Sequence, residues 1–417
     1  MNVTGIIAEY NPFHRGHAYH IAKARELTKA DYVVVVMSGN YVQRGAPALT
    51  DKFARAKMAL KNGADMVFEL PLLWSTSAAP DFAAGGTAFL DKLGCVTHIS
   101  YGCETEEPKN LVNLAEFLLR EPREFSLALK KSQGKGLAYP LAFEQAFLSW
   151  AKENPSCDFP CTTREKFHEI FSSPNNILGL EYQKNLLRRQ SNLIPCPVPR
   201  MGSDYHSPDL ETCFSSATAI RNAVFSGREV PLEQYMPKTA ADLLPPQKYL
   251  LRENDFSQML YYKLLSESWM GYESYLGGSP FLSNRIKKHL ELFSGYSGFC
   301  ETLKTKDVTY AKISRFLLHI LLNITTEDAA LLKSLGYIPY FRLLGFKSTA
   351  KPLLKMIEKQ GDAPLITKPA RAKSLLSKKA YLLYKKELFS SDLYYGLQVQ
   401  KGIQDSANEC RKSLVIL

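Results

Sequence analysis

The fold is decided by residues 3–37, which read VTGIIAEYNPFHRGHAYHIAKARELTKADYVVVVM. The apolar run 3–8 predicts a strand, which ends where Pro12 disfavours further pairing. Apolar residues then recur at helical spacing over 16–27. The β-branched run 31–37 predicts a second strand that is buried on both faces, as in a parallel sheet. Strand, helix and strand in this order predict a right-handed crossover.

The same alternation continues along the chain. The elements that we expect next are a helix over 52–62, a strand over 65–70, a helix over 78–93, a strand over 96–101, helices over 111–150 (interrupted near 134 and 136) and 175–187, and a proline-broken run over 194–198. Beyond residue 231 helical patterns dominate, with a short turn region at 336–345. The predicted fold class is therefore α/β, a Rossmann-like, doubly wound parallel sheet followed by a mainly α-helical part. Ligands of such sheets bind at the carboxyl ends of the strands, where residues 11–17, residues 38–44 and Gly102 fall.

The chain has 417 residues and a net charge of +11, and its charge is unevenly distributed. Residues 1–225 contain 24 basic and 23 acidic side chains, whereas residues 226–417 contain 28 and 18. Ordinary apolar and charged fractions exclude a disordered chain, a collagen-like repeat and a small disulfide scaffold. The length predicts two or three domains, and we place the main boundary between 1–228 and 229–417. The basic second half fits a polyanion-binding module, although a merely solvated basic surface would have the same composition.

The eight cysteines are scattered and form no CxxC motif, which favours a reduced cytoplasmic setting over a disulfide framework. Cys157, Cys161, His168 and Cys196 are too irregularly spaced to predict a zinc site, so we expect no metal centre in the protein. The N-terminal residues do not resemble a signal peptide, and the most apolar stretch, 316–324, is too short to cross a bilayer. We expect a cytoplasmic protein that has no contact with a membrane.

Two histidines open the first predicted helix. His14 and His17 stand three residues apart, with Gly16 between them, directly after the first strand. A helix N-terminus offers unpaired amide groups and partial positive charge, and Gly16 allows close approach to the backbone. The two imidazoles can donate hydrogen bonds to phosphate oxygens as negative charge builds on them. This position predicts a site for a nucleoside triphosphate, whereas HxGH alone would also fit a metal-binding pair or two surface histidines.

A second phosphate-binding element is predicted at residues 216–221, SATAIR. Ser216 and Thr218 supply hydroxyl groups at a helix start, and Arg221 follows one turn later. Taken alone, the segment would equally be an ordinary helix cap with a surface arginine. Together with HxGH early in the chain, it resembles the two signatures of the HIGH-type nucleotidyltransferase superfamily.

The resemblance extends over nearly the whole chain. The segments that carry it are GIIAEYNPFHRGH (5–17), VVVMSGNYVQRGAPALTDKFARAKMAL (34–60), GADMVFELP (63–71), SYGCE (100–104), SPNNILGLEY (173–182), SSATAIR (215–221) and PYFRLLGF (339–346). They resemble the bacterial tRNA(Met) cytidine acetate ligase family. This resemblance implies an enzyme that uses ATP and acetate, passes through an acetyl-adenylate, and forms N4-acetylcytidine at the wobble cytidine of elongator tRNA(Met).

The resemblance also implies which residues contact ATP. The family's first-strand loop and helix match Ile7, Ala8, Glu9, Tyr10, Asn11, Pro12, Phe13, His14, Arg15, Gly16, His17, Ala18, Tyr19 and His20. Three further contacts match Gly102, Asn175 and Arg200, and Cys103 stands where we expect a serine. In the implied mechanism, acetate attacks the α-phosphorus of ATP while His14, His17 and the amides of the 216–221 turn stabilise the charge. Mg²⁺ is expected to accompany the phosphates, although no carboxylate cage for it is evident.

Several polar residues have both a structural and a functional interpretation. Gln43, Arg44 and Gly45 follow the second strand and form either a plain turn or a contact with acetate or tRNA. Asp51, Lys52 and Arg55 share a helical face, and we expect a solvated salt-bridge cluster rather than a functional one. Within the basic second half, where Tyr310 and His319 also lie, we predict a tRNA-binding surface that includes Lys287, Lys288, Lys304, Lys306, Lys312, Arg315 and the basic residues of 368–379.

Two other functions remain compatible with these motifs. One is an adenylyltransferase for a small phosphorylated cofactor precursor, although such enzymes are usually much shorter and need no basic helical half. The other is a non-catalytic RNA-binding protein that retains a relic nucleotide fold. ATP binding and the identity of the acceptor distinguish the three possibilities.

Overall fold

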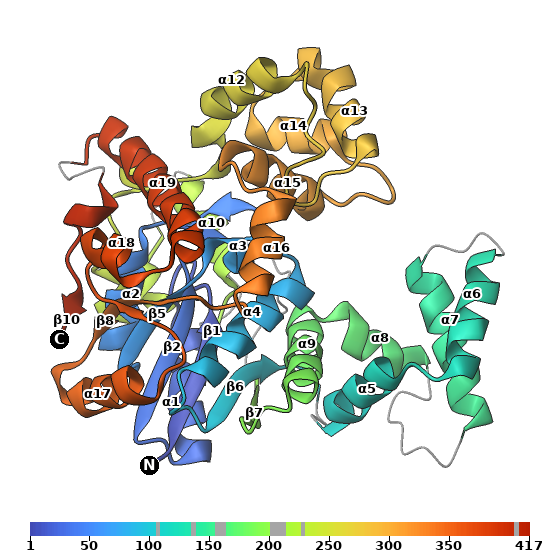
Figure 1. The fold of residues 1–417 in the computed structure, drawn as a ribbon, viewed down its shortest axis with the longest axis horizontal. Helices are drawn as coiled ribbons and strands as arrows, with labels where there is room; N and C mark the ends of the chain where they lie inside the picture. Colours follow the sequence, from blue (N-terminus) through green and yellow to red (C-terminus); the bar gives the residue numbers. More distant parts are fainter. Residues whose placement is uncertain (106–108, 135–138, 155–163, 201–213, 227–229, 404–407) are drawn as a thin grey trace.

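The protein folds around one mixed β-sheet, shown by the computed structural model in Figure 1. The structure describes residues 1–105, 109–134, 139–154, 164–200, 214–226, 230–403 and 408–417. Within them the strand order is β10-β8-β5-β2-β1-β6-β7, and β9 also pairs with β8. The strands are β1 (Val3–Ala8), β2 (Tyr32–Ser38), β5 (Met66–Leu70), β6 (His98–Cys103), β7 (Ile194–Pro199), β8 (Phe341–Phe346), β9 (Leu365–Ile366) and β10 (Val415–Ile416).

The five strands from β5 to β7 in this order are parallel and include the four strands predicted first from the sequence. Residues 33–36 of β2 have no exposed surface, as expected for a strand covered on both faces. The proline-broken run 194–198 lies within β7, at the edge of the sheet, where missing N–H donors are tolerated. The predicted α/β fold class is confirmed.

Helices cover both faces of this sheet. The chain steps from β1 to β2 and β5 in one direction and then returns across the sheet to β6. Right-handed crossovers therefore place α4 (Ala79–Lys92) on the face opposite α1 (Arg15–Thr28) and α2 (Lys52–Lys61). The short α3 (Leu72–Ser75) precedes α4, and α9 (Pro174–Arg189) packs against α4. The carboxyl ends of the parallel strands meet at one edge of this sandwich.

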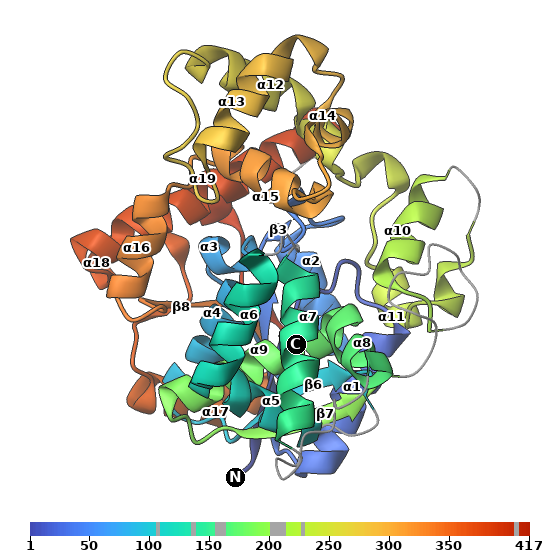
Figure 2. The same ribbon diagram turned by 90° about the vertical axis from the view of Figure 1, so that its right-hand side faces the viewer.

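A helical arm projects from the sheet beyond β6. It consists of α5 (Lys109–Arg120), α6 (Arg123–Gly134), α7 (Tyr139–Glu153) and α8 (Arg164–Ser172). Helix α5 packs against α9, while α6 and α7 lie far from the sheet in Figure 1 and stand in front of it in Figure 2, where the arm points toward the viewer. The predicted helical stretch 111–150 is thus also broken between α5 and α6, where Glu121 has a positive φ of 39° and Pro122 follows.

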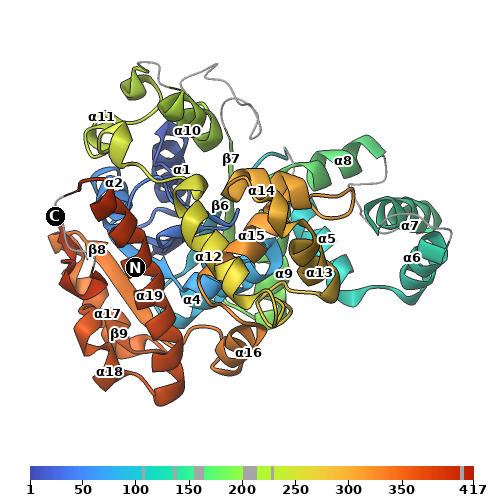
Figure 3. The same cartoon turned by 90° about the horizontal axis from the view of Figure 1, so that it is seen from above.

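The second half of the described chain is mainly helical. Its longer helices are α12 (Ser257–Glu267), α13 (Pro280–His289), α14 (Tyr296–Leu303), α15 (Tyr310–Leu321), α16 (Thr326–Ser334), α17 (Lys351–Gln360) and α19 (Lys378–Gln400), with the shorter α11 (Lys238–Ala241) and α18 (Ala372–Leu375). Helices α12 to α15 form a separate group above the sheet in Figures 1 and 2, and this group lies toward the viewer in Figure 3. None of the helices within the described ranges combines the length and apolar character that a membrane crossing requires.

The predicted turn region at 336–345 is wrong in part. Residues Phe341–Phe346 form the fully buried strand β8, which pairs antiparallel with β5. Arg342 and Gly345 interrupt the apolar pattern and make this strand resemble a turn in the sequence. The predicted boundary between 228 and 229 lies outside the described residues, but β8, β9 and β10 show that the second half returns to the sheet of the first half.

Candidate active site

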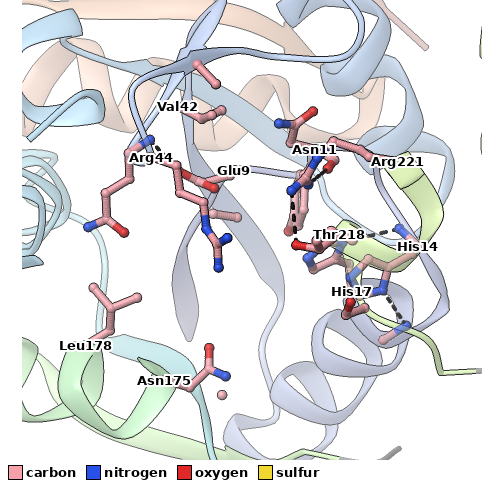
Figure 4. A pocket seen from close by; sticks show the side chains of 18 of the residues that line it. Glu9, Asn11, His14, His17, Val42, Arg44, Asn175, Leu178, Thr218 and Arg221 are labelled. Carbon is pink, nitrogen blue, oxygen red and sulfur yellow. Dashed lines mark hydrogen bonds between the residues drawn. The ribbon is translucent and has the colours of Figure 1, made fainter. Parts of the chain in front are cut away.

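A cavity of about 720 Å³ opens at the carboxyl ends of β1 and β6 (Figure 4). Its floor is the β1–α1 turn, and one wall comes from Gly102 of β6 and Asn175 of α9. A second wall is the start of α10 (Ala217–Phe225). The remaining lining comes from the hairpin β3 (Tyr41–Val42) and β4 (Ala46–Pro47), from the 3-10 turn Glu253–Phe256 and from α15. This volume lies in the usual range of small-ligand sites.

The two histidines of the first turn hold each other in place. The Nδ1 atom of His14 accepts a hydrogen bond from the amide of Gly16 (3.1 Å), and Nδ1 of His17 accepts one from the amide of His14 (3.2 Å). Their rings stack with centroids 3.7 Å apart. Because both Nδ1 atoms accept, each neutral ring carries its proton on Nε2. The turn therefore provides two N–H donors beside the cavity.

Both rings are neutral donors rather than cations. Burial, with the nearby Arg200 and Arg221, lowers the pKa of His14 to about 3. Burial also lowers the pKa of His17 well below its ordinary value, and that of His20 to about 4. A fixed N–H donor stabilises a growing negative charge without needing a proton from solvent. This arrangement suits chemistry at a phosphorus atom near neutral pH.

Gly16 is required by the packing of this turn. A Cβ atom at position 16 would lie 2.9 Å from Cε1 and 3.1 Å from Nδ1 of His14. The His14 ring is buried and stacked on His17, so it has little room to move. The glycine thus permits the histidine geometry as well as close access to the backbone.

The predicted second element lies against the first. Ser216 caps α10 by accepting a hydrogen bond from the amide of Ala219 (3.1 Å). Arg221 donates to Oγ1 of Thr218 (3.0 Å) and to the main-chain carbonyl of Asn11 (2.7 Å). The latter bond ties α10 to the turn between β1 and α1, and Figure 4 shows Thr218 beside His14 and His17. The structure therefore brings both predicted turns to one cavity.

A third corner contains the other predicted ATP contacts. Asn175 donates to Oε1 of Glu104 (2.7 Å), and Arg200 lies 3.3 Å from the same oxygen. A Cβ atom at Gly102 would lie 3.4 Å from the Arg200 side chain, so the glycine leaves space for it. Glu104 was not predicted, although its place directly after β6, two residues beyond Gly102, was a usable signal.

Not every residue of the predicted segment 7–20 faces the cavity. Ten of the fourteen do, and the exceptions are Pro12, Phe13, Arg15 and Ala18. Phe13 is wholly buried in the core, and Arg15 donates instead to the main-chain carbonyl of Glu233 (2.7 Å). The cavity also contains residues that we did not predict, including Tyr182, Arg252 and Asn254. Tyr182 ends the segment SPNNILGLEY, which was a usable signal, whereas Arg252 and Asn254 lie in no motif that the sequence suggested.

The expectation of a solvated cluster at Asp51, Lys52 and Arg55 is wrong for the two basic residues. Arg55 is completely buried and donates to the carbonyls of Glu9 (2.6 Å) and Ser38 (3.1 Å), which supports the strand ends behind the cavity. The ammonium group of Lys52 is also buried. It belongs to a buried ion cluster that consists of Lys52, Glu69, Arg342 and Glu409.

The expectation that His319 lies on a basic surface is also wrong, because the residue is buried. Its buried ring bonds the carbonyl of Leu276 (2.8 Å) and Oγ1 of Thr76 (3.1 Å), which anchors α15. Tyr310, by contrast, lines the cavity. Cys157 and Cys161 lie outside the described residues, and no three His, Cys, Asp or Glu side chains gather as a metal site in the described part.

Replacing His319 by glutamine is expected to destabilise the protein in a pH-dependent manner. Burial lowers the pKa of His319 to about 4, so the folded state excludes a proton that the unfolded state binds below its ordinary value of 6.5. The contribution of His319 is complete above pH 6.5 and is lost as the pH falls toward 4. Urea titrations of both proteins should show the stability difference shrinking by about 1.4 kcal/mol per pH unit over this window. A constant difference would contradict the burial of a neutral ring.

Comparisons with known proteins agree with this geometry. Residues 1–409 match the family model described as HIGH Nucleotidyl Transferase. The tRNA(Met) cytidine acetate ligase of Thermosipho melanesiensis is 34% identical over 98% of this chain and 100% of its own, and that of Halothermothrix orenii is 37% identical over 94% of both. The chain belongs to the tRNA(Met) cytidine acetate ligase family. The family predicted from the sequence is thereby confirmed.

Solved structures extend the likeness to the whole fold. The apo crystal structure of Thermotoga maritima TmcAL matches with a TM-score of 0.91 and 28% identity over the full length of both chains. A second structure of the Thermotoga protein, bound with alpha-thio ATP, matches with a TM-score of 0.89. Because relatives in the acetate ligase family match both halves of this chain, the basic second half is part of the family's architecture.

Proposed function

We propose that this protein acetylates N4 of the wobble cytidine of elongator tRNA(Met), using acetate and ATP. The observation that carries this proposal is the meeting of the His14–His17 turn and the Ser216 turn over one cavity, in a chain of this ligase family. Two other functions were compatible with the motifs: an adenylyltransferase for a small phosphorylated acceptor and a non-catalytic RNA-binding protein with a relic nucleotide fold. Neither explains why the chain matches these ligases over its basic second half as well. We place the reaction in the cytoplasm, where the tRNA substrate is present.

The first step activates acetate. An acetate oxygen attacks the α-phosphorus of ATP, the bond to the β-phosphate oxygen breaks, and pyrophosphate leaves with that electron pair. The Nε2–H groups of His14 and His17 donate to oxygens whose charge grows during attack. The amides at the start of α10 and the guanidinium of Arg221 provide further donors on the facing side.

ATP and Mg²⁺ are proposed on different grounds. The alpha-thio ATP complex of the Thermotoga relative supports ATP as the nucleotide. Mg²⁺ would neutralise phosphate charge when it is bound. No group of three His, Cys, Asp or Glu side chains that could hold it gathers among the described residues.

The basic surface of the second half is proposed to hold the tRNA. Lys287, Lys288, Lys304, Lys306 and Lys312 are exposed, on α13, α15 and the segment between α14 and α15. Helix α15 also reaches the cavity with Tyr310 and Ser314. Arg315 is half-buried and donates to the carbonyl of Gln43 (3.3 Å), so its predicted tRNA contact is the least accessible of the set.

Reversing the charge of Lys287 and Lys288 together is expected to weaken tRNA binding. Loss of two phosphate contacts lowers affinity uniformly across tRNA sequences and reduces the slope of log K against log salt by about 2. The matched control is Lys355→Glu with Lys359→Glu on α17, which lies far from α13 in Figure 1. Filter binding at several salt concentrations measures both slopes, and equal slopes for the two double variants would contradict this surface.

The proposed activity is tested by mass analysis of tRNA nucleosides. The protein is incubated with ¹³C-labelled acetate, ATP and tRNA(Met), and the tRNA is digested. Labelled N4-acetylcytidine should appear at the wobble position and require ATP, and a transcript with uridine at that position should stay unlabelled. No ATP-dependent label in tRNA would refute the proposal. Pyrophosphate release with a small phosphorylated acceptor and no RNA would favour the adenylyltransferase.

A further inference from the structure

The cavity has a second end, opposite the phosphate-binding turns. Glu9 follows β1 directly and lies beside Arg44 and Val42, whereas His14, His17 and Thr218 group on the other side of Figure 4. Oε1 of Glu9 accepts a hydrogen bond from the amide of Gln43 (2.7 Å). This bond fixes the carboxylate against the hairpin while the side chain still lines the cavity.

The same end of the cavity adjoins the helical second half. The carbonyl of Gly45 accepts hydrogen bonds from Tyr296 (3.0 Å) and from Ser314 of α15 (2.8 Å). Gly45 has a φ of 80°, and a Cβ atom there would lie 2.3 Å from the amide nitrogen of Arg315. The hairpin that holds Glu9 is therefore packed on the helix that carries Lys312. This end of the cavity therefore lies next to α15, on the side of the proposed tRNA-binding surface.

The charge of Glu9 selects what it can bind. A carboxylate repels both the phosphates of ATP and the acetate anion, but it accepts hydrogen bonds from an amino group, as acidic side chains do from N4 of cytosine. We propose that Glu9 binds the N4 amino group of the target cytidine and accepts its proton during acetyl transfer. This inference rests on the proposed function, and it assigns Glu9 to the acceptor rather than to ATP.

Acetyl transfer proceeds by addition to the acetyl carbonyl and then elimination of AMP. The N4 lone pair attacks the carbonyl carbon of the acetyl-adenylate, and the carbonyl π electrons move to oxygen. Glu9 takes one N4 proton as the new C–N bond forms. The tetrahedral intermediate then collapses, the bond between carbon and the phosphate oxygen breaks, and AMP leaves with that electron pair. Water or the departing phosphate finally removes the proton from Glu9.

The surroundings of Glu9 suit a proton acceptor. Burial raises the pKa of its carboxyl group, while the Gln43 amide and the charges of Arg221, Arg44 and Arg55 oppose this rise. A carboxylate whose pKa is raised by burial is a stronger base than an exposed one. The main-chain carbonyl of Glu9 is also held by Arg55, so the residue is fixed at both ends.

The test separates the two half-reactions in the full-length protein. Acetate-dependent exchange of labelled pyrophosphate into ATP, without tRNA, reports activation, and single-turnover transfer of labelled acetate to tRNA(Met) reports the second step. For Glu9→Gln we expect transfer to fall by about 10²–10⁴-fold and exchange by much less. The matched control is Glu26→Gln on the exposed side of α1, where Glu26 pairs with Lys23. It should leave both rates unchanged.

The possible outcomes are distinguishable. Equal losses of exchange and transfer in Glu9→Gln would overturn the inference. They would indicate that Glu9 contacts the adenine amino group of ATP or is needed for folding. Normal transfer in this variant would overturn it too. A wild-type protein that shows acetate-dependent exchange but no transfer to tRNA(Met) would refute the proposed function as well as the inference.

Discussion

Replacing His14 by alanine is expected to lower kcat for acetyl transfer by about 10²–10³-fold, with a smaller change in the KM for ATP. The substitution removes the Nε2–H donor of His14 and the ring that stacks on His17. Both effects act where negative charge develops on the phosphate, so they weaken the transition state more than the bound ground state. Steady-state kinetics with tRNA in excess measures the two constants.

His98 provides the control for this prediction. His98→Ala removes an imidazole at the opposite end of β6, far from the strand ends that form the cavity, and should leave kcat unchanged. The His14→Ala, His17→Ala double variant should be little worse than either single variant, because the two rings act as one unit. A His14→Ala enzyme with full activity would remove the histidine turn from the mechanism.

Replacing Lys52 by methionine is expected to destabilise the protein by about 3–5 kcal/mol near neutral pH. The ammonium Nζ of Lys52 lies 2.8 Å from Glu69 and 3.0 Å from Glu409, and Arg342 lies 3.2 Å from Glu409. Burial and the neighbouring Glu69 raise the pKa of Glu387, the next carboxyl group. Without Lys52, two carboxylates would share one arginine in a buried site. Urea unfolding measures the loss of stability.

A second substitution distinguishes charge imbalance from lost packing. Adding Glu69→Gln to Lys52→Met removes the carboxylate whose ion pair with Lys52 is lost, while Glu409 keeps Arg342, and should restore part of the stability. Lys61→Met, at the exposed end of the same helix, is the control and should cost much less. A Lys52→Met variant as stable as the wild type would show that this cluster does not join the two halves of the chain.

The local parts of the fold and site could be predicted from sequence. The run 31–37 has one plausible structure because a continuous β-branched stretch of this length fits a buried strand. His14 and Ser216 were predictable for a similar reason, since each stands at a helix start where unpaired amides bind anions. A parallel sheet then brings both starts to the carboxyl edge.

Contacts between distant segments could not be predicted in this way. Lys52 resembles a solvated residue in the sequence, and it is buried because Glu409, far along the chain, folds back over it. Strand β8 was mistaken for a turn because its partner, β5, lies some 270 residues earlier. The carboxylate of Glu9 is held at the cavity by the amide of Gln43 in the β3–β4 hairpin, and this hairpin is in turn packed on α15. In each case packing across the two halves decides the role of the residue.

The central claim is that the His14–His17 turn and the Ser216 turn bind one ATP molecule together. A crystal structure of this protein with a non-hydrolysable ATP analogue tests the claim most directly. The predicted result is a triphosphate in the cavity, within hydrogen-bonding distance of Nε2 of both histidines and of the amides that begin α10. A triphosphate that contacts one turn and not the other, or that lies outside the cavity, would contradict the account.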